Sequence, residues 1–222
     1  MMYQQALEAQ RRALVRSWRS SGWVRSEALL AAFDAVPREE FVLPELQQQA
    51  YEDQPLPILR GKTISQPSTT MLMTDALSVE QGMKVLEIGA GSGYQSALLA
   101  LLVGEKGKVF SMEVLPELVA FARRNLERIA FKNVVVVEGD GSQGLPEEAP
   151  FDRIIVTAAC PKIPEPLLNQ LKDGGVLVAP VGKLEVQAMV RATKSNSAVV
   201  EQRFDEFVFS PLVGKYGFEE RL

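Results

Sequence analysis

The stretch that decides the fold is Lys84-Val-Leu-Glu-Ile-Gly-Ala-Gly-Ser-Gly-Tyr94, an apolar run that ends in alternating glycines at Gly89, Gly91 and Gly93. It leads directly into the largely apolar segment Gln95-Ser-Ala-Leu-Leu-Ala-Leu-Leu102. A strand that turns sharply into a helix places backbone without side chains, and a helix N-terminus, against a bound nucleotide-like ligand. The stretch therefore predicts a cofactor pocket.

The spacing of the glycines argues against one class of cofactor. A dinucleotide fingerprint that starts at Gly89 needs a glycine where Tyr94 stands, and one that starts at Gly91 meets Ser96. A nicotinamide or flavin dinucleotide is therefore disfavoured, and a Rossmann dehydrogenase is only a third alternative, after the functions described below.

Length and charge restrict the class of protein further. The chain has 222 residues, which fits one domain with a buried core. Its net charge is −4, and Lys and Arg are scattered among acids, so we expect no nucleic-acid partner. The first residues do not follow the pattern of a signal peptide, and no uncharged run reaches about 20 apolar residues. We therefore expect a cytoplasmic protein that makes no membrane contact.

Two residue types are nearly or wholly missing. Histidine is absent, which excludes a histidine-based triad, a histidine–zinc site and an imidazole base. No metal is expected. Cysteine occurs once, at Cys160, so no intrachain disulfide forms, which agrees with a reducing compartment. We interpret Cys160 as a buried packing residue.

The hydrophobic pattern predicts an α/β fold. Apolar strands that alternate with helices imply a parallel sheet covered on both faces. The last two strands, 186–193 and 199–209, flank a turn at 194–197 and are expected to add to the sheet edge in antiparallel fashion. The other expected strands are 83–88, 108–113, 133–138, 152–158 and 175–180, and the expected helices are 3–20, 26–35, 68–78, 93–103, 115–130 and 165–171.

One long segment, residues 41–67, lacks clear periodicity and is rich in Pro and Gln. We expect a long ordered loop or a lid there, because loops of this length in compact domains are often functional.

Three acidic residues lie in or directly after the expected strands, close to the predicted pocket. Glu113 closes the second strand, where a carboxylate can accept from both hydroxyls of a ribose; the alternative is a solvated acid. Asp140 follows the third strand and is expected to accept from an adenine amine, unless it only forms an Asp-Gly turn. Glu87 either orients the glycines, lies near the positive end of the ligand, or makes a structural hydrogen bond.

A strand ending in Glu-x-Gly-x-Gly-x-Gly, with acids closing the next two strands, resembles the class I S-adenosylmethionine-dependent methyltransferases over roughly residues 68–210. Within that class, segments along nearly the whole chain are similar in order to the protein-L-isoaspartate (D-aspartate) O-methyltransferase family. The most specific is Thr63-Ile-Ser-Gln-Pro67. The others are Val36–Phe41, Ala50–Asp53, Pro55–Pro57, Gly139–Gly141, Ala149–Ala158 and Pro180–Gly182.

The resemblance implies a Rossmann-like sheet, mostly parallel with antiparallel C-terminal strands and extra N-terminal helices. It implies one methyltransferase domain over 1–222, in which 1–67 form the helices and active-site loop and 68–222 the cofactor-binding core. The implied reaction moves a methyl group from S-adenosylmethionine to the α-carboxylate of L-isoaspartyl residues in damaged proteins and peptides, leaving S-adenosylhomocysteine. The methyl ester then collapses to a succinimide, which starts repair.

The resemblance also assigns residues. Ser65 is implied as the active-site hydroxyl, with Thr63 and Ile64 as pocket walls. The residues implied to bind the cofactor are Glu87, Gly89, Gly91, Gly93, Glu113, Asp140 and Gly141.

This reaction suits a chain without histidine. An α-carboxylate with an ordinary pKa of about 3.5 to 3.9 is already ionised at neutral pH, so no base is needed. Its attack on a sulfonium cation cancels both charges, so an apolar pocket does not oppose it. Ile64, Val181 and Leu212 are expected as apolar walls. We expect Ser65 to orient the substrate carboxylate as a hydrogen-bond donor; the alternative is that it caps the helix starting near Ser68.

Arg60-Gly61-Lys62 stands where the family pattern has a Gly-Gln lead into Thr-Ile-Ser, which leaves the peptide preference open. Two other functions remain alternatives. One is a methyltransferase of the same fold that acts on a small molecule or on tRNA, although the acidic charge argues against tRNA. The other is a module that binds the methyl donor without catalysis, against which the intact Thr63–Ser65 motif argues.

Overall fold

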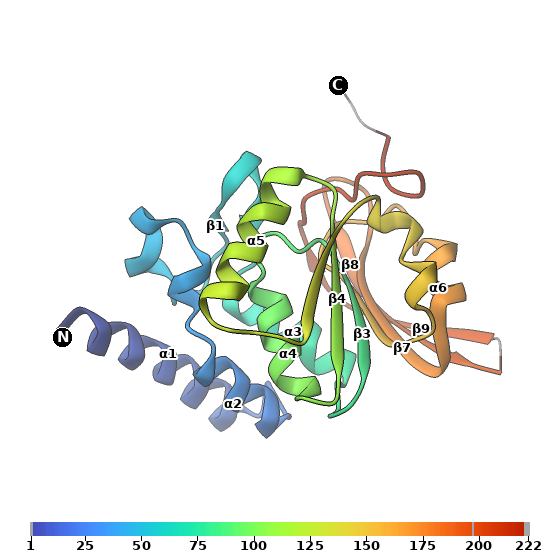
Figure 1. Cartoon of the computed structure of the whole chain (residues 1–222). Helices are drawn as coiled ribbons and strands as arrows, with labels where there is room; N and C mark the ends of the chain where they lie inside the picture. The colour runs from blue at the N-terminus through green and yellow to red at the C-terminus, as the bar shows by residue number, and fades with distance from the viewer. Residues whose placement is uncertain (1, 197, 220–222) are drawn as a thin grey trace.

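The computed structural model describes residues 2–196 and 198–219 and is built around a seven-stranded sheet (Figure 1). The strand order is β5-β4-β3-β6-β7-β8-β9. The first five strands are parallel, and β8 and β9 add to the edge in antiparallel fashion, as expected. The bounds are β3 (Lys84–Ile88), β4 (Lys108–Glu113), β5 (Val134–Glu138), β6 (Phe151–Val156), β7 (Leu171–Gly182), β8 (Gln187–Ser195) and β9 (Ala198–Phe207).

Helices cover both faces of this sheet (Figure 1). On one face α3 (Pro67–Leu77), α4 (Tyr94–Val103) and α5 (Pro116–Arg128) pack on the strands, and on the other lies α6 (Glu165–Gln170). Strand β3 divides its side chains accordingly: Val85 joins the core beneath α3 and α4, while Leu86 joins the core beneath α6. The α/β fold expected from the sequence is confirmed.

Two further helices precede the sheet, α1 (Met2–Ser21) and α2 (Glu27–Ala35). Ser26 caps α2, because its hydroxyl oxygen accepts a hydrogen bond from the Leu29 amide at 3.1 Å. None of the helices in the described ranges is long and apolar enough to cross a membrane.

The segment expected as a long loop or lid is ordered and contains a small hairpin. Short 3-10 turns, η1 (Arg38–Phe41) and η2 (Pro44–Gln49), lead into β1 (Leu56–Pro57), which pairs antiparallel with β2 (Thr63–Ile64). The connecting turn is η3 (Leu59–Gly61). We call residues 56–65 the hairpin segment. Hairpin strands of two residues leave no periodicity to detect, which is why the sequence indicated only a loop.

Most predicted boundaries agree within two residues, and two differences stand out. Strand β7 runs from Leu171 to Gly182 and is longer than the expected 175–180, because it starts directly after α6. The predicted turn at 194–197 includes Ser197, which lies outside the described residues.

Candidate active site

The glycine loop, residues 89–93, lies at the carboxyl end of β3 and is held on several sides. The amides of Gly89 and Ala90 donate to the Met112 carbonyl at 2.8 and 3.0 Å. The Asn125 side chain of α5 donates to the Ser92 carbonyl at 2.9 Å. The three glycines have φ angles of 98°, 54° and 87°, a region that side chains disfavour. The loop therefore presents bare backbone in a fixed shape.

Gly89 is the most restricted position of this loop. A Cβ atom there would lie 2.5 Å from the hydroxyl oxygen of Thr157, at the end of β6. That hydroxyl oxygen is 2.7 Å from the Gly89 carbonyl oxygen, so Thr157 fixes the loop. The role of Thr157 was not predicted from the sequence, because a threonine after a strand carries no distinctive pattern.

Glu113 lies at the end of β4, on the wall of a cavity beside the glycine loop. Its Oε2 accepts from the Gly91 amide at 3.0 Å, and its Oε1 accepts from the amides of Val114 and Leu115 at 2.9 and 3.1 Å. A carboxylate offers about four acceptor positions. Glu113 therefore orders the loop and retains room for a ligand hydroxyl.

The carboxylate of Asp140, which was expected to accept from an adenine, accepts four hydrogen bonds from the protein itself. Its Oδ1 accepts from the amide and hydroxyl of Ser142, and its Oδ2 from the Gln143 side chain and the Lys215 amide, at 2.6 to 3.0 Å. Burial raises the pKa of this carboxyl, but the hydrogen bonds from Lys215 and Ser142 outweigh it and leave the pKa below its usual value. Gly141 lines the cavity, whereas Asp140 does not, so Asp140 anchors the C-terminal chain.

Glu87 is fully buried and faces α4 rather than the cavity. Its Oε2 accepts from the hydroxyls of Ser111, at 2.6 Å, and Ser96. Burial raises the pKa of Glu87 to about 7. The hydrogen bonds from Ser111 and Ser96 lower this pKa, and the negative charge of Glu113 raises it. Of the three alternatives, the structure places Glu87 in a structural hydrogen-bond cluster beneath the glycine loop.

The hairpin segment brings Thr63 and Ser65 to the same cavity. Ile64 between them points into the hydrophobic core, as alternation along a strand requires. The residue at the cap of α3 is Gln66 and not Ser65, and the Ser68 amide donates to Asp53 Oδ1 at 2.8 Å. Ser65 therefore does not serve as the helix cap.

Arg38 lies beneath Ser65 and was missed, because arginine is seldom fully buried. Its Nε donates to the Ala50 carbonyl at 2.7 Å, and its Nη2 to the Ser65 carbonyl at 2.8 Å. The guanidinium carbon lies 5.0 Å from the ring centre of Tyr94 on α4. Burial lowers the pKa of Arg38, which the nearby tyrosines and Asp53 partly offset. Arg38 therefore joins the turn at Ala50, the hairpin segment at Ser65 and helix α4 at Tyr94.

The cavity measures about 850 Å³, within the usual range for small-molecule sites. Besides the residues above it is lined by the C-terminal segment, residues 206–213, including Leu212. Of the predicted site residues, those that line it are Thr63, Ser65, Gly89, Gly91, Glu113 and Gly141; those that do not are Ile64, Glu87, Gly93, Asp140 and Val181. Val181 lies instead in the core beneath α6.

Cys160 is fully buried, and burial raises its pKa to about 12, in keeping with a packing role. Within the part of the chain that the structure describes, no group of three His, Cys, Asp or Glu side chains is arranged to hold a metal ion.

Comparison with known proteins agrees with this geometry. The model of the Protein-L-isoaspartate(D-aspartate) O-methyltransferase family matches residues 9–217. A protein-L-isoaspartate O-methyltransferase from Methanothrix thermoacetophila is 50% identical over 195 residues, covering 88% of this chain and 92% of its own. One from Hyperthermus butylicus is 48% identical over 222 residues, covering 96% of this chain and 92% of its own.

Solved structures give the same picture. A protein-L-isoaspartate O-methyltransferase, 36% identical, superposes with a TM-score of 0.84 over 93% of this chain and 67% of its own. The putative enzyme from Plasmodium falciparum, solved in complex with S-adenosyl-L-homocysteine, is 24% identical and has a TM-score of 0.79, covering 91% of this chain and 98% of its own. The fold, the cavity and these relatives together place the chain in the protein-L-isoaspartate(D-aspartate) O-methyltransferase family.

Proposed function

We propose that this protein transfers the methyl group of S-adenosylmethionine to the α-carboxylate of L-isoaspartyl residues in damaged proteins and peptides, which starts their repair through a succinimide. The observation that supports this best is the meeting of two elements at one cavity. The glycine loop and Glu113 form one part of its wall, and Thr63 and Ser65 form another.

The first part of the wall fits the methyl donor. At Gly89 and Gly91 the backbone is bare, and Glu113 retains an acceptor position suited to a ribose hydroxyl. Gly141 also needs to be glycine, because a Cβ there would lie 2.5 Å from Ile88. When bound, S-adenosylmethionine supplies a methyl group on a positively charged sulfur and leaves as S-adenosylhomocysteine.

The second part of the wall suits the acceptor. An isoaspartyl α-carboxylate arrives ionised, so the chain needs no base and its lack of histidine costs nothing. Ser65 donates a hydrogen bond to this carboxylate and orients it. Holding the carboxylate oxygen, the methyl carbon and the sulfur in line is a task for the whole cavity, and it can supply on the order of 7 to 11 kcal/mol of the barrier reduction.

We also infer that the chain works as one domain in the cytoplasm. Arg38 ties the N-terminal segment to Ser65 and packs on Tyr94 of the sheet-covering helix, which supports a single folding unit. The lone buried Cys160 supports a reducing compartment.

The decisive assay measures base-labile methyl incorporation into a synthetic isoaspartyl peptide, beside its normal aspartyl twin and bulk tRNA. We expect label in the isoaspartyl peptide only, because only there is the free carboxylate an α-carboxylate bonded directly to the backbone; in the aspartyl twin the free carboxylate lies one methylene further from the chain. Equal labelling of both peptides, or label in tRNA alone, would contradict the proposal.

The Ser65→Ala variant tests the proposed role of the hydroxyl. We expect methyl transfer to the isoaspartyl peptide to fall tenfold or more, with little change in S-adenosylhomocysteine affinity, because Ser65 contacts only the acceptor. The matched control is Ser20→Ala, which removes an exposed hydroxyl on α1. Turnover equal to that of the unsubstituted protein would remove Ser65 from this role.

A further inference from the structure

The turn of the hairpin segment carries two cations at the cavity. Arg60 and Lys62 both line it, and they flank Gly61 in a tight turn in which Arg60 has a φ of 58° and Gly61 a φ of 65°. The turn is closed by a hydrogen bond from the Ile58 amide to the Lys62 carbonyl at 2.8 Å. The backbone of Lys62 is therefore fixed, directly before β2.

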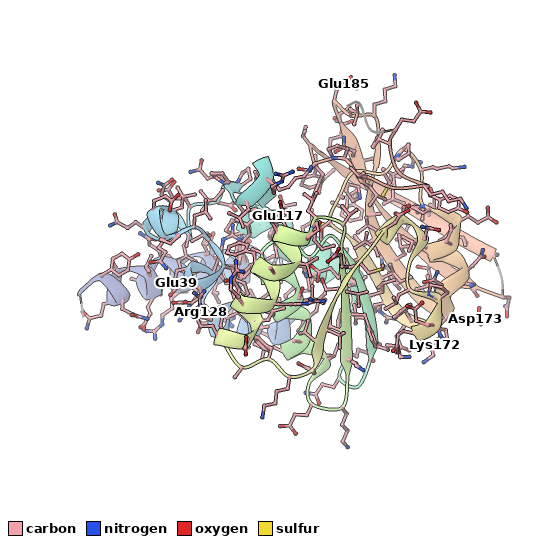
Figure 2. The ribbon with its side chains drawn as sticks, turned by 45° about the horizontal axis from the view of Figure 1, so that its top comes forward. Glu39, Glu117, Arg128, Lys172, Asp173 and Glu185 are labelled. Atoms are coloured by element: carbon pink, nitrogen blue, oxygen red, sulfur yellow. The ribbon has the colours of Figure 1, made fainter. Side chains whose placement is uncertain are left out.

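The two cations differ in their partners. Arg60 Nη1 lies 3.7 Å from Glu117 Oε1. Glu117 stands at the N-terminal end of α5 (Figure 2). Among the described residues no carboxylate oxygen lies within 4 Å of the Lys62 ammonium. The charge of Arg60 is therefore paired with Glu117, whereas Lys62, which also lines the cavity, has no such carboxylate partner among the described residues.

The other charged residues on the cavity wall are two acids. Glu113 is bound to three backbone amides of the glycine loop and its flank. Glu206 stands exposed on β9, on the C-terminal part of the wall. The hairpin side of the cavity is therefore positive, and the C-terminal side is negative.

The reacting carboxylate is not the partner that suits Lys62. Its charge disappears as the methyl group is transferred, so a cation bound to it stabilises the ground state more than the transition state and slows the step. Lys62 also precedes Ser65 by three residues, which is about 10 Å along extended backbone. An extended peptide advances about 3.3 Å per residue, so the Lys62 side chain reaches substrate residues two or three positions from the isoaspartyl site.

We propose that Lys62 is a specificity-determining residue that binds an acidic side chain of the substrate, two or three positions from the isoaspartyl residue. This inference rests on the proposed function. It makes the enzyme prefer damaged sites with an acidic neighbour on the side that lies along the hairpin segment. Binding of this kind acts equally on ground state and transition state, so it appears in KM and is weakened by salt.

The test uses isoaspartyl peptides that differ only at the second and third positions on one side or the other, where each carries Glu, Gln or Lys. For the unsubstituted protein we expect KM to be severalfold lower with Glu than with Lys on one side of the site, and this difference to shrink at 0.5 M salt. In Lys62→Glu the preference reverses, an overall change of about tenfold in the KM ratio, and in Lys62→Arg it returns.

The matched control is Lys106→Glu, an equal charge change on the exposed turn between α4 and β4, at the end of β4 opposite to Glu113. It should leave the preference as it is in the unsubstituted protein. A Lys62→Glu variant with the unchanged KM ratio overturns the proposal, as does a change that falls on kcat with every peptide alike, because that would place Lys62 at the reacting carboxylate. If no isoaspartyl peptide, including the Gln-flanked one, is methylated by the unsubstituted protein, the proposed function itself fails.

Discussion

The two parts of the cavity wall are built in different ways. The glycine loop is fixed mainly by nearby backbone and by the ends of neighbouring strands, through Met112, Glu113 and Thr157. The hairpin segment has only two paired positions of its own and is fastened by side chains from other segments, above all Arg38. We call the glycine-loop part of the wall the donor half and the hairpin-segment part the acceptor half. The shape of the donor half is set by the sheet, whereas that of the acceptor half depends on individual long-range contacts that single substitutions can remove.

The largest effect should come from Arg38→Leu, which attacks the acceptor half. It leaves the Ala50 and Ser65 carbonyls without a donor in the interior, so we expect a loss of about 3 to 5 kcal/mol in the free energy of unfolding. Urea unfolding measures this. In protein that remains folded, methyl transfer should fall more than S-adenosylhomocysteine affinity.

Its control is Arg19→Leu, since Arg19 pairs with Glu27 on the surface and should contribute less than about 1 kcal/mol. The contrast between the two halves would fail if Arg38→Leu weakened S-adenosylhomocysteine binding as strongly as it slowed methyl transfer.

The next largest effect should come from Gly89→Ala, which attacks the donor half. The new methyl group would meet the Thr157 hydroxyl at 2.5 Å, so the loop must shift. We expect S-adenosylhomocysteine to bind about a hundredfold more weakly by calorimetry, a change of about 2.7 kcal/mol.

Gly82→Ala provides a matched control, because Gly82 also has a positive φ, 81°, but a Cβ there meets nothing within 4 Å. Both variants therefore place a side chain at a positive φ, and only Gly89→Ala carries the clash. Similar affinities for the two variants would show that the shape of the loop tolerates a side chain.

The smallest of these effects concerns the cluster beneath the glycine loop. Burial raises the pKa of Glu87 from about 4.5 to about 7, so the folded protein keeps this proton at a pH where the unfolded chain has lost it. Stability should therefore fall as pH rises between these two values. In Glu87→Gln this loss disappears, so the variant should gain about 2 kcal/mol relative to the unsubstituted protein between pH 5 and pH 7.

Urea unfolding at pH 5, 6, 7 and 8 checks this, with the exposed Glu105→Gln as the control. If the stability of the unsubstituted protein and that of Glu87→Gln changed with pH in parallel, Glu87 would be ionised throughout this range. The buried cluster would then not be a source of pH dependence.

The donor half was largely predictable from sequence, because local patterns determine it. Alternating glycines after an apolar strand fix a tight turn, and Glu113 closes the next strand at the same sheet edge. The sequence pattern does not indicate which carboxylates keep an acceptor position for a ligand. Asp140 looks like a ligand in sequence, but its oxygens are taken partly by the amide of Lys215, which is 75 residues away.

The acceptor half was predicted only through the resemblance of Thr63–Ser65 to the family pattern. Its geometry depends on Arg38, whose two carbonyl partners lie 12 and 27 residues away. No periodicity marks such a residue, and charged side chains are ordinarily exposed. Of the C-terminal segment that completes the cavity, only Leu212 was predicted. The position of this segment depends on the hydrogen bond between Asp140 and the Lys215 amide, and on backbone hydrogen bonds of Ala159 with Ser210 and Leu212.

The buried guanidinium of Arg38 also determines how acidity reaches the reaction. An arginine does not give up its proton under any condition in which a protein folds, so the contact that supports the Ser65 carbonyl is the same in acid and in mild alkali. A lysine or histidine in its place would release that strand over part of the range. If Ser65 orients the substrate as proposed, this support for its backbone does not vary with pH.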